Sequence, residues 1–388
     1  MLLSFIQALT AAISAEHFIT ISTMSSEIPT LRWGIIATGL ISSWFVEDLV
    51  LERSNARAKH IVQSVGSSSL EKGKAFVEKH LPGKTPTVYG SYAEVYNDPS
   101  VDVIYIGTPH AFHKQNCLDA INAGKHVLCE KAFAITAREA REVFEAARKK
   151  GVFVMEAMWT RFFPLTRSLL NVLHSEKLIG KIHRVFCDFA MNMNLASLGP
   201  DSRLKNPALG AGSLLDIGVY SLTFTILGLD PGVGDKAEKP KISATQTLSD
   251  DIDIATSALL LYSSGKQGIL TASTQVKTPP GFCRIEGSDG YVIVEGIATS
   301  VPGSFTVHSS KASGEGWVES TTEGLKSKKF DFERPGKGFY WEADAVALDI
   351  TAGRTESEIM PWAETVRVME ILDEIRRQGG AKFPQDEQ

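Results

Sequence analysis

Three groups of residues, far apart in the chain, have the types and the spacing that proton transfer beside a bound nucleotide would need. A glycine-bearing turn, Ala37-Thr38-Gly39-Leu40-Ile41-Ser42, follows one apolar stretch, Glu130-Lys131 follows another, and Asp216 precedes Tyr220 by four residues. Residues four apart lie on the same face of a helix, so we expect Asp216 and Tyr220 to lie side by side. Together the three groups indicate a redox enzyme rather than a simple nucleotide-binding protein.

The turn at residues 37–42 has the position and the small residues of a dinucleotide-binding turn. Gly39 stands for the middle glycine of G-x-G-x-x-G/A, while Ala37 and Ser42 replace the flanking ones. A residue without a side chain lets the backbone approach a pyrophosphate at a helix N-terminus. A chance turn between strand and helix is the alternative. The predicted dinucleotide contacts here are Ala37, Thr38, Gly39, Leu40 and Ile41.

The residues after the second predicted strand favour NADP over NAD. The stretch Gly66-Ser67-Ser68-Ser69-Leu70-Glu71-Lys72 has no carboxylate at the strand tip, where an NAD enzyme binds the ribose hydroxyl groups. The hydroxyl groups of residues 67–69 and the charge of Lys72 suit a 2′-phosphate instead. A solvated serine-rich turn with a helix cap is the alternative interpretation. The predicted phosphate contacts are Ser67, Ser68, Ser69 and Lys72.

The predicted strands are expected to form a parallel sheet, and further polar residues lie at its carboxyl edge. Thr108-Pro109-His110 follows the third predicted strand, and His113 comes one turn later. His110 and His113 could pair on a metal, but roles in the cofactor loop and at the helix start fit better, so we predict no metal site. Lys131 leaves the fourth strand at the same edge, beside the expected nicotinamide, although a lysine at the surface is the alternative.

A tyrosine beside a lysine can supply the base that oxidation of a hydroxyl group needs. Free tyrosine has a pKa near 10, so work near neutrality asks for a shift of about 3 units, or roughly 4 kcal/mol. A lysine cation about 4 Å away supplies about that much at an effective dielectric constant near 20. We therefore predict that Lys131 lowers the pKa of Tyr220, the general base. Asp216 would orient the substrate or Lys131, or act as the base itself.

The elements expected around these residues divide the chain into two domains. Strands at 32–37, 60–65, 101–106, 126–130 and 152–156 alternate with helices, which predicts an α/β Rossmann domain with a doubly wound parallel sheet over residues 31–157. Longer alternating strands and hairpin turns at 263–266 and 287–290 predict an α+β domain over residues 158–388. Its open, mainly antiparallel sheet would carry helices on one face. The other face needs a cover, so we expect a homodimer.

Composition limits the classes of partner. The chain has 388 residues, a net charge of −5 and a pI near 6.0, which gives no electrostatic reason to expect nucleic acid or an anionic membrane as a partner. Four scattered cysteines without C-x-x-C spacing suit reduced thiols in a cytoplasmic protein.

Both ends of the chain are expected to lie outside the two domains. Residues 1–30 read as an extension, disordered or absent in the mature protein. Residues 2–15 are similar to the apolar part of a signal peptide, yet no Lys or Arg precedes Arg32, so a start at Met24 is favoured. Residues 379–388 read as a polar tail.

These residues together resemble the glucose-fructose oxidoreductase/inositol dehydrogenase (Gfo/Idh/MocA) family over about residues 31–380. The resemblance rests on residues 108–110 with His113, on 123–131, on Met155-Glu156-Ala157-Met158-Trp159-Thr160-Arg161-Phe162-Phe163-Pro164, and on 216–220. Within the family, the chain is most similar to the subgroup of dimeric dihydrodiol dehydrogenases and fungal NADP-dependent D-xylose 1-dehydrogenases. Two departures are Ala132 in place of a proline and Ala37 in place of a glycine.

The resemblance implies NADP-dependent oxidation of the anomeric hydroxyl of an aldopyranose such as D-xylose, or of a trans-dihydrodiol. It implies that Tyr220 is the general acid/base and that Lys131 and Asp216 support it. The cofactor would contact Thr108, Pro109, His110, His113, Glu130, Lys131, Trp159 and Arg161, and the substrate would contact Lys131, Trp159, Phe162, Asp216 and Tyr220. The segment 191–207 shows no motif.

Two other functions remain open on the same scaffold. The first is a non-catalytic regulatory protein that senses a dinucleotide. The retention of Lys131, Asp216 and Tyr220 argues against this function. The second is a sugar oxidoreductase or epimerase that holds its cofactor tightly.

Overall fold

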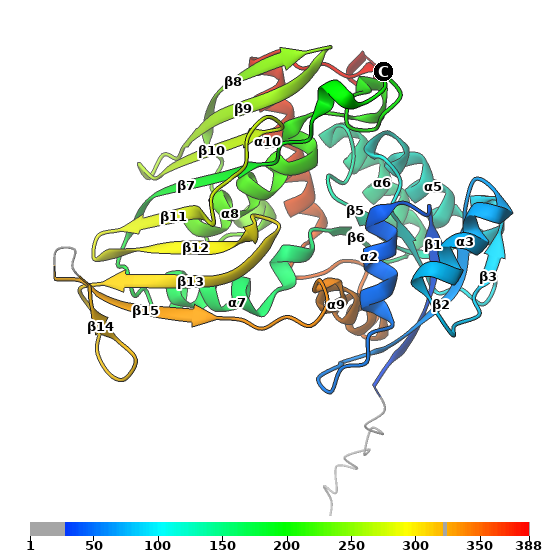
Figure 1. The fold of residues 1–388 in the computed structure, drawn as a ribbon, viewed down its shortest axis with the longest axis horizontal. Coiled ribbons are helices and arrows are strands. Elements are labelled where there is room, and N and C mark those ends of the chain that lie inside the picture. Colours follow the sequence, from blue (N-terminus) through cyan, green and yellow to red (C-terminus); the bar gives the residue numbers. More distant parts are fainter. Residues whose placement is uncertain (1–27, 321–323, 388) are drawn as a thin grey trace, which may run out of the picture.

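The alternating strands and helices of the first half form one parallel sheet (Figure 1). The computed structural model describes residues 28–320 and 324–387, and in it the strand order is β3-β2-β1-β4-β5-β6. The strands are β1 (Thr30–Ile36), β2 (Lys59–Gly66), β3 (Thr87–Tyr89), β4 (Val103–Ile106), β5 (His126–Glu130) and β6 (Val154–Ala157). The order reverses between β1 and β4, and such a reversal opens a ligand crevice at the carboxyl ends of the strands.

Helices connect these strands, as predicted for a Rossmann domain. They are α2 (Leu40–Leu49), α3 (Leu70–His80), α4 (Tyr92–Tyr96), α5 (His113–Asn122) and α6 (Ala137–Lys150). At the start of α6, Thr136 Oγ1 accepts a hydrogen bond from the Glu139 amide at 3.2 Å, and Gly151 ends the helix with a φ of +68°. A side-chain oxygen satisfies a free amide at the first end, and glycine adopts the left-handed conformation readily at the second. The five predicted strands are confirmed; the short edge strand β3 was not predicted.

The predicted N-terminal extension ends earlier than residue 30. Thr30 already belongs to β1, and the Pro29 carbonyl oxygen accepts a hydrogen bond from the Lys59 amide at 2.8 Å. Residues 29 and 30 are therefore part of the Rossmann domain. The rest of the extension up to residue 27, with its signal-like stretch, lies outside the described residues.

The second half contains a nine-stranded sheet in the order β14-β15-β13-β12-β11-β7-β10-β9-β8. The strands are β7 (Ile182–Ala190), β8 (Lys241–Ser249), β9 (Ile252–Leu261), β10 (Gln267–Ser273), β11 (Gly281–Gly287), β12 (Gly290–Ala298), β13 (Val301–Ser309), β14 (Val318–Glu319) and β15 (Lys326–Asp331). Both predicted hairpins, β9–β10 and β11–β12, are confirmed. The strands β7 and β10 pair in parallel and the other described pairs are antiparallel, so the sheet is mixed and mainly antiparallel.

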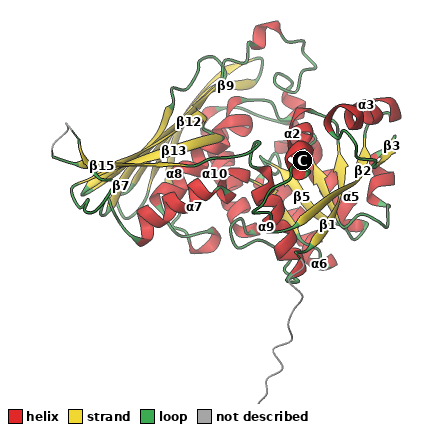
Figure 2. Cartoon of the chain, turned by 60° about the horizontal axis from the view of Figure 1, so that its bottom comes forward, coloured by secondary structure: helices red, strands yellow, loops and turns green. Residues whose placement is uncertain are grey.

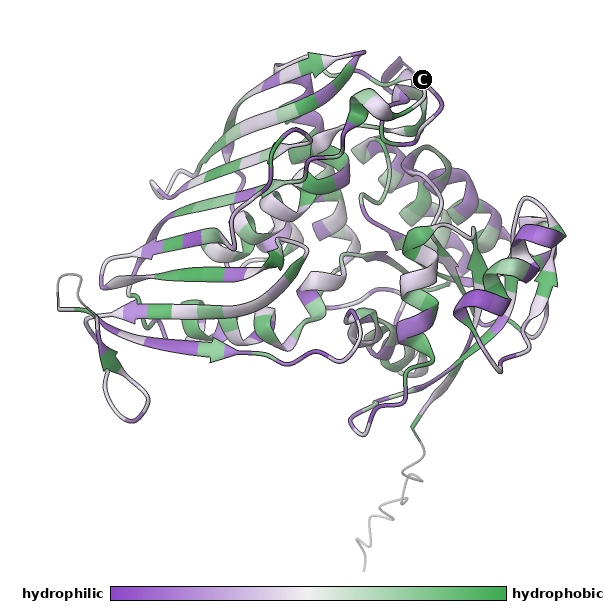
Figure 3. Cartoon of the chain, viewed as in Figure 1, coloured by the Kyte–Doolittle hydropathy of each residue, from purple (hydrophilic) through white to green (hydrophobic). Residues whose placement is uncertain are grey.

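Helices cover one face of this sheet and separate it from the Rossmann domain (Figure 2). They are α7 (Pro164–Leu170), α8 (Val219–Leu229) and α10 (Trp362–Gly379). Along β9, Ala258 and Leu260 are buried, whereas Leu259 and Leu261 are 36% and 39% exposed. Figure 3 shows that hydrophobic and hydrophilic residues are mixed along the strands of this sheet. Successive strand residues point to opposite faces, so one face meets the helices and the other faces outward. The stretch 207–229 is apolar and long enough to cross a membrane, but 94% of its most apolar window is buried, as in a core helix.

The last two helices, which belong to the predicted domain 158–388, pack against the predicted Rossmann domain 31–157. Helix α9 (Phe339–Thr351) begins against α2, where the Asp48 carboxylate accepts hydrogen bonds from the backbone amides of residues 337–339. At the start of α10, Trp362 Nε1 donates a hydrogen bond to the Val154 carbonyl of β6 at 2.8 Å. Helix α10 also packs against β8, so it joins the two sheets.

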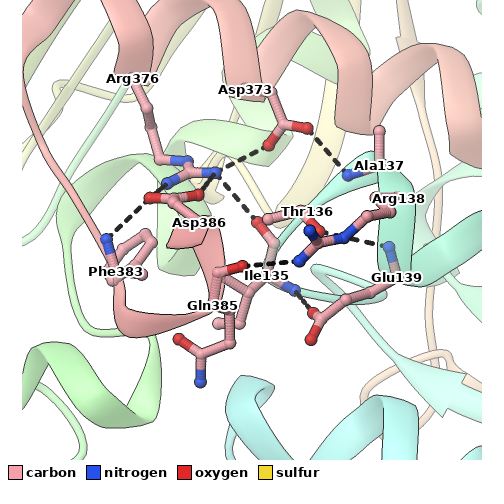
Figure 4. Close-up of polar contacts among 10 residues, drawn as sticks. All are labelled: Ile135, Thr136, Ala137, Arg138, Glu139, Asp373, Arg376, Phe383, Gln385 and Asp386. Atoms are coloured by element: carbon pink, nitrogen blue, oxygen red, sulfur yellow. Dashed lines mark hydrogen bonds and ion pairs between the residues drawn. The ribbon is translucent and has the colours of Figure 1, made fainter. Parts of the chain in front are cut away.

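The C-terminal residues dock on α6 and α10 and do not form the predicted polar tail (Figure 4). Arg376, whose side chain is 4% exposed, donates hydrogen bonds to the Asp386 carboxylate at 2.8 and 2.9 Å and to Asp373 at 2.8 Å. Asp373 also accepts the Ala137 amide at 2.8 Å, at the start of α6. The Phe383 ring lies against the Arg376 guanidinium. One buried cation thus joins the chain end to both helices.

Arg376→Ala is expected to lower the free energy of unfolding by about 3 kcal/mol, because it leaves two carboxylates without their buried partner. Chemical denaturation measures this change. Arg377→Ala is the matched control, since the neighbouring arginine is 71% exposed and its pair with Glu374 is screened by solvent and adds little to stability. Equal losses in the two variants would show that the buried cluster does not hold the C-terminus.

Candidate active site

A cavity of about 440 Å³ lies at the carboxyl edge of the Rossmann sheet, where the strand order reverses. Its wall brings together residues of all three predicted groups. Those residues are Ala37, Gly39, Leu40, Ile41, Thr108, Pro109, His110, Glu130, Lys131, Trp159, Asp216 and Tyr220. Eight other predicted site residues lie outside this wall: Thr38, Ser67, Ser68, Ser69, Lys72, His113, Arg161 and Phe162.

The turn after β1 leaves room for a ligand at the start of α2. Gly39 has a φ of −80°, and a Cβ atom added to it would meet nothing within 4 Å, so neither the backbone nor the packing requires glycine there. The open space belongs to the cavity. Ala37 has a φ of +75°, the conformation that the glycine it replaces adopts more readily. The free amides of the first turn of α2 therefore face a space that an anion can enter.

Close packing holds α2 against the sheet beside this turn. A Cβ atom added to Gly107, after β4, would collide with the hydroxyl group of Ser42 in α2. Ser42 is fully buried and stands in place of the third glycine of the predicted turn motif. Small residues on both sides thus fix the distance between the helix start and the strand end, as this position of the motif requires.

Lys131 reaches across the cavity to Asp216. Its Nζ donates a hydrogen bond to the Asp216 carbonyl oxygen at 2.8 Å and lies 3.6 Å from the carboxylate oxygen Oδ1. The backbone after Lys131, where the peptide bond to Ala132 is cis, is held by His113, whose Nδ1 lies 3.0 Å from the Ala132 carbonyl oxygen. Burial lowers the pKa of His113 to about 4, so its ring is neutral at pH 7. His113 therefore supports the strand end that carries Lys131 from behind and is not in the cavity wall.

Asp216 binds a second cation that the sequence analysis missed. Arg203 Nη1 donates a hydrogen bond to Asp216 Oδ1 at 3.3 Å. Burial acts to raise the pKa of Asp216, but the charges of Lys131 and Arg203 outweigh it and the pKa lies at about 2. Arg203 comes from the segment 191–207, which also contributes Met191 and Met193 to the wall. This segment carries no motif, and its irregular backbone gave no signal of its position.

The structure contradicts the prediction that Lys131 brings the pKa of Tyr220 down toward neutrality. The Tyr220 side chain is buried, and burial together with the negative charge of Glu130 raises its pKa well above 10. Lys131 Nζ lies 5.2 Å from the centre of the Tyr220 ring, and its hydrogen bond goes to Asp216. The phenol oxygen accepts a hydrogen bond from Trp159 Nε1 at 2.7 Å, which opposes the rise. In the protein alone, Tyr220 is therefore a neutral phenol in the same cavity as Lys131.

Residues 155–164 form one of the motifs on which the family resemblance rests. Its short 3-10 helix, Trp159–Phe162, has one side chain in the cavity wall and others in the core. The Trp159 ring lies in the wall and stacks on Phe339 of α9, with ring centres 4.1 Å apart. Arg161 pairs instead with the buried Glu364 of α10, and Phe162 is 6% exposed in the core. The structure thus gives Arg161 a partner 203 residues away and places it outside the cavity, at variance with the predicted cofactor contact.

The serine-rich turn after β2 lies beside the turn at residues 37–39. The hydroxyl groups of Ser67 and Thr38 are 3.2 Å apart, and the Ser69 hydroxyl accepts a hydrogen bond from the Lys72 amide at the start of α3. Ser67 is buried, whereas Ser68 and Lys72 are exposed. Lys72 Nζ lies 3.5 Å from the Ser68 hydroxyl oxygen. An exposed hydroxyl and an ammonium group therefore stand together at the tip of β2.

Three further observations concern possible sites outside this cavity. A hollow of about 610 Å³ beside β2 contains none of the predicted site residues. Among residues 28–320 and 324–387, no group of three or more His, Cys, Asp and Glu side chains is placed to hold a metal ion. The four cysteines are free and buried, in agreement with the prediction of reduced thiols. The chemistry of the described residues is therefore concentrated in the cavity with Lys131.

The fold and the site define an oxidoreductase that binds a nicotinamide dinucleotide. Residues 31–158 match the sequence model of the oxidoreductase family with an NAD-binding Rossmann fold (GFO/IDH/MocA), and residues 170–293 match its C-terminal domain. The chain belongs to the GFO/IDH/MocA family, as the resemblance predicted.

Individual relatives cover nearly the whole chain. The D-xylose 1-dehydrogenase (NADP(+)) of Hypocrea jecorina is 34% identical, and the alignment covers 92% of this chain and 94% of that protein. The trans-1,2-dihydrobenzene-1,2-diol dehydrogenase of Sus scrofa is 36% identical, with 92% and 99% covered. The crystal structure of the aldose-aldose oxidoreductase of Caulobacter crescentus complexed with glycerol has the same fold, with a TM-score of 0.73, 22% identity, and 90% and 98% covered.

Gly39→Ala is expected to weaken binding of a nicotinamide dinucleotide about tenfold or more, since a methyl group would occupy the space in which the backbone meets the pyrophosphate. The free energy of unfolding should change by less than about 1 kcal/mol, because the protein leaves that space open. Fluorescence titration and denaturation measure the two effects. Gly303→Ala is the control, since Gly303 also has open space but lies outside the cavity. Unchanged affinity in Gly39→Ala would contradict the assignment of the turn.

Proposed function

We propose that the protein is an NADP-dependent dehydrogenase that oxidises a ring hydroxyl group, either the anomeric hydroxyl of an aldopyranose such as D-xylose or that of a trans-dihydrodiol. One observation carries this proposal: Lys131, Asp216 and Tyr220 line the same cavity as the turn with Gly39. The names of the two relatives above support both substrate classes. Both kinds of substrate present neighbouring hydroxyl groups on a ring.

The residues at the cavity mouth fit a bound NADP. Gly39 and the N-terminus of α2 would face the pyrophosphate, where the free amides and the helix dipole favour negative charge. Ser68 and Lys72 would face the 2′-phosphate, a group that hydroxyl and ammonium donors bind well. When bound, the nicotinamide supplies the acceptor for the hydride that leaves the substrate carbon. The serines at the tip of β2 support NADP over NAD, because the acidic residue that binds a ribose 2′-hydroxyl is missing from that position.

Tyr220 would transfer the proton in both directions of the reaction. As a neutral phenol it can donate a proton to a carbonyl group that is being reduced, and as a phenolate it can accept the proton of a hydroxyl group. The hydrogen bond from Trp159 and the charge of Lys131 stabilise the phenolate. Asp216 would hold Lys131 in place and, with Lys131, orient the reacting hydroxyl. The raised pKa of Tyr220 implies that oxidation is faster at alkaline pH.

Tyr220→Phe is expected to lower kcat by about 10²–10⁴-fold while the Kd of NADP+ changes little. Wild type and variant are assayed with NADP+ or NAD+ and a panel of pentoses, hexoses and trans-dihydrodiols, through the absorbance of the reduced nicotinamide. In the wild type, the oxidation rate should increase with pH over the alkaline range, because the phenolate fraction increases. The variant should lack this increase.

The matched control is Tyr262→Phe, which removes a phenol oxygen that is also buried and lies outside the cavity. Its kcat should equal that of the wild type. Equal turnover in Tyr220→Phe would refute the proton-transfer assignment. Binding of NADP+ by the wild type without turnover of any substrate would support the regulatory alternative, and purification with bound nicotinamide would support the enzyme with a tightly held cofactor.

We further propose that the outward face of the large sheet pairs with a second copy of the chain. Leu259 and Leu261 are exposed there, and a shallow hollow of about 400 Å³ lies between Leu259, Ile269 and Thr245. Apolar side chains on an open sheet gain free energy when another sheet covers them. The symmetric solution is a dimer in which the same face of each copy takes part.

Leu259→Asp is expected to convert the dimer to monomers in sedimentation velocity, because the buried interface would then contain two unpaired carboxylates. Val318→Asp is the control, since Val318 is 64% exposed on the edge strand β14 and lies outside the hollow. A monomeric wild type, or a Leu259→Asp variant that remains dimeric, would contradict this interface.

A further inference from the structure

Two buried glutamates, one in the cavity wall and one behind it, have no cation to pair with among the described residues. Glu130, at the end of β5, is 3% exposed and lines the cavity, while Glu342, on α9, is fully buried. Within the described residues, neither carboxylate forms an ion pair with Lys, Arg or His. Glu342 also has no hydrogen-bond partner for either oxygen. Burying an unpaired carboxylate costs several kcal/mol, so the protonated, neutral form of both groups is favoured.

The cations of the cavity are already engaged by Asp216. Lys131 Nζ donates to the Asp216 carbonyl and lies 3.6 Å from its carboxylate, and Arg203 donates to the same carboxylate at 3.3 Å. Glu130 is left with two weaker partners, the Tyr105 hydroxyl at 2.7 Å and the Lys131 amide at 3.3 Å. The carboxyl group of Glu130 is thus the acidic group of the wall that still lacks a positive partner.

The surroundings of the two glutamates give their carboxyl groups different pKa values. Burial raises the pKa of Glu130 to about 7, although the charges of Lys131 and Arg203 and the Tyr105 hydroxyl act to lower it. Burial and the charge of Glu130 raise the pKa of Glu342 well above its ordinary value, so Glu342 remains protonated while Glu130 ionises. Negative charge on either glutamate also acts to raise the pKa of Tyr220. Of the two, Glu130 is the one that titrates near neutral pH.

We propose that Glu130 adjusts its proton to the charge of the nicotinamide ring: it is partly protonated in the free protein near neutral pH, and it becomes the carboxylate partner of the positively charged ring when NADP+ binds. Glu342 stays neutral behind it. Glu130 regains its proton when the ring is reduced and loses its charge, so the negative charge of this wall follows the positive charge of the ring. This inference rests on the proposed function, because it needs a nicotinamide in the cavity.

The test is the number of protons released on binding, measured by titration calorimetry in two buffers of different protonation enthalpy. At pH 7, NADP+ should release roughly half a proton per chain more than NADPH does, because a carboxyl group with a pKa of about 7 is half protonated there. The difference should vanish near pH 9, where Glu130 is already ionised. NADPH is the matched ligand, since it carries the same phosphates and an uncharged ring.

Two variants assign the proton. In Glu130→Gln, the difference between NADP+ and NADPH should disappear, since the amide cannot release a proton. In Glu342→Gln, it should persist, because this residue is neutral in both states. A difference that persists in Glu130→Gln, or equal proton release by the two ligands in the wild type, would overturn the inference and leave the dehydrogenase proposal standing. Failure to bind either ligand would instead refute the proposed function, and with it this inference.

Discussion

Asp216 binds both cations of the cavity, and this interaction determines the charge of the groups around it. Its carboxylate lies 3.6 Å from Lys131 Nζ and 3.3 Å from Arg203 Nη1. Opposite charges at such distances in a buried site stabilise the ionised forms, so Asp216 stays negative although burial opposes it. Glu130 and Tyr220 have no ion-pair partner and are buried, which favours their neutral forms. The cavity therefore combines one fixed ion cluster with two groups whose protons can move.

The position of these groups depends on contacts between the two halves of the chain. Trp159 donates a hydrogen bond to Tyr220, and its ring stacks on Phe339 at the start of α9. The start of α9 is held in turn by Asp48 in α2, the helix whose other end faces the cavity at Gly39. Helix α2 thus supports the dinucleotide turn at its N-terminus. Near its C-terminus it holds α9, which in turn supports Trp159, the hydrogen-bond donor to Tyr220. The cofactor side and the proton-transfer side of the site therefore share one support.

Sequence reasoning found the features of the site that depend on local pattern. The strands, the turn at Gly39, Lys131 at a strand end and the four-residue spacing of Asp216 and Tyr220 are local, and the structure brings them into one cavity. It missed the features that depend on partners distant in sequence. Arg161 pairs with Glu364, and Arg203 and Glu342 come from segments whose neighbours no local pattern reveals. The same reason explains why the direction predicted for the pKa shift of Tyr220 was wrong. The spacing allowed Lys131 to bind either Tyr220 or Asp216, and only the distances show that it binds Asp216.

A raised pKa changes the role that Tyr220 can play without removing it from the chemistry. A phenolate becomes a stronger base as its pKa increases toward that of a substrate hydroxyl, while the fraction of phenolate at neutral pH falls. The hydrogen bond from Trp159 limits that increase. The positive charge of Lys131, 5.2 Å from the ring centre, also favours the phenolate. In the reductive direction, the neutral phenol is already the form that donates a proton. In the proposed role of Tyr220, the buried cavity would favour reduction at neutral pH and oxidation at alkaline pH with the same residue, because burial sets the proton affinity and the neighbouring cation only moderates it.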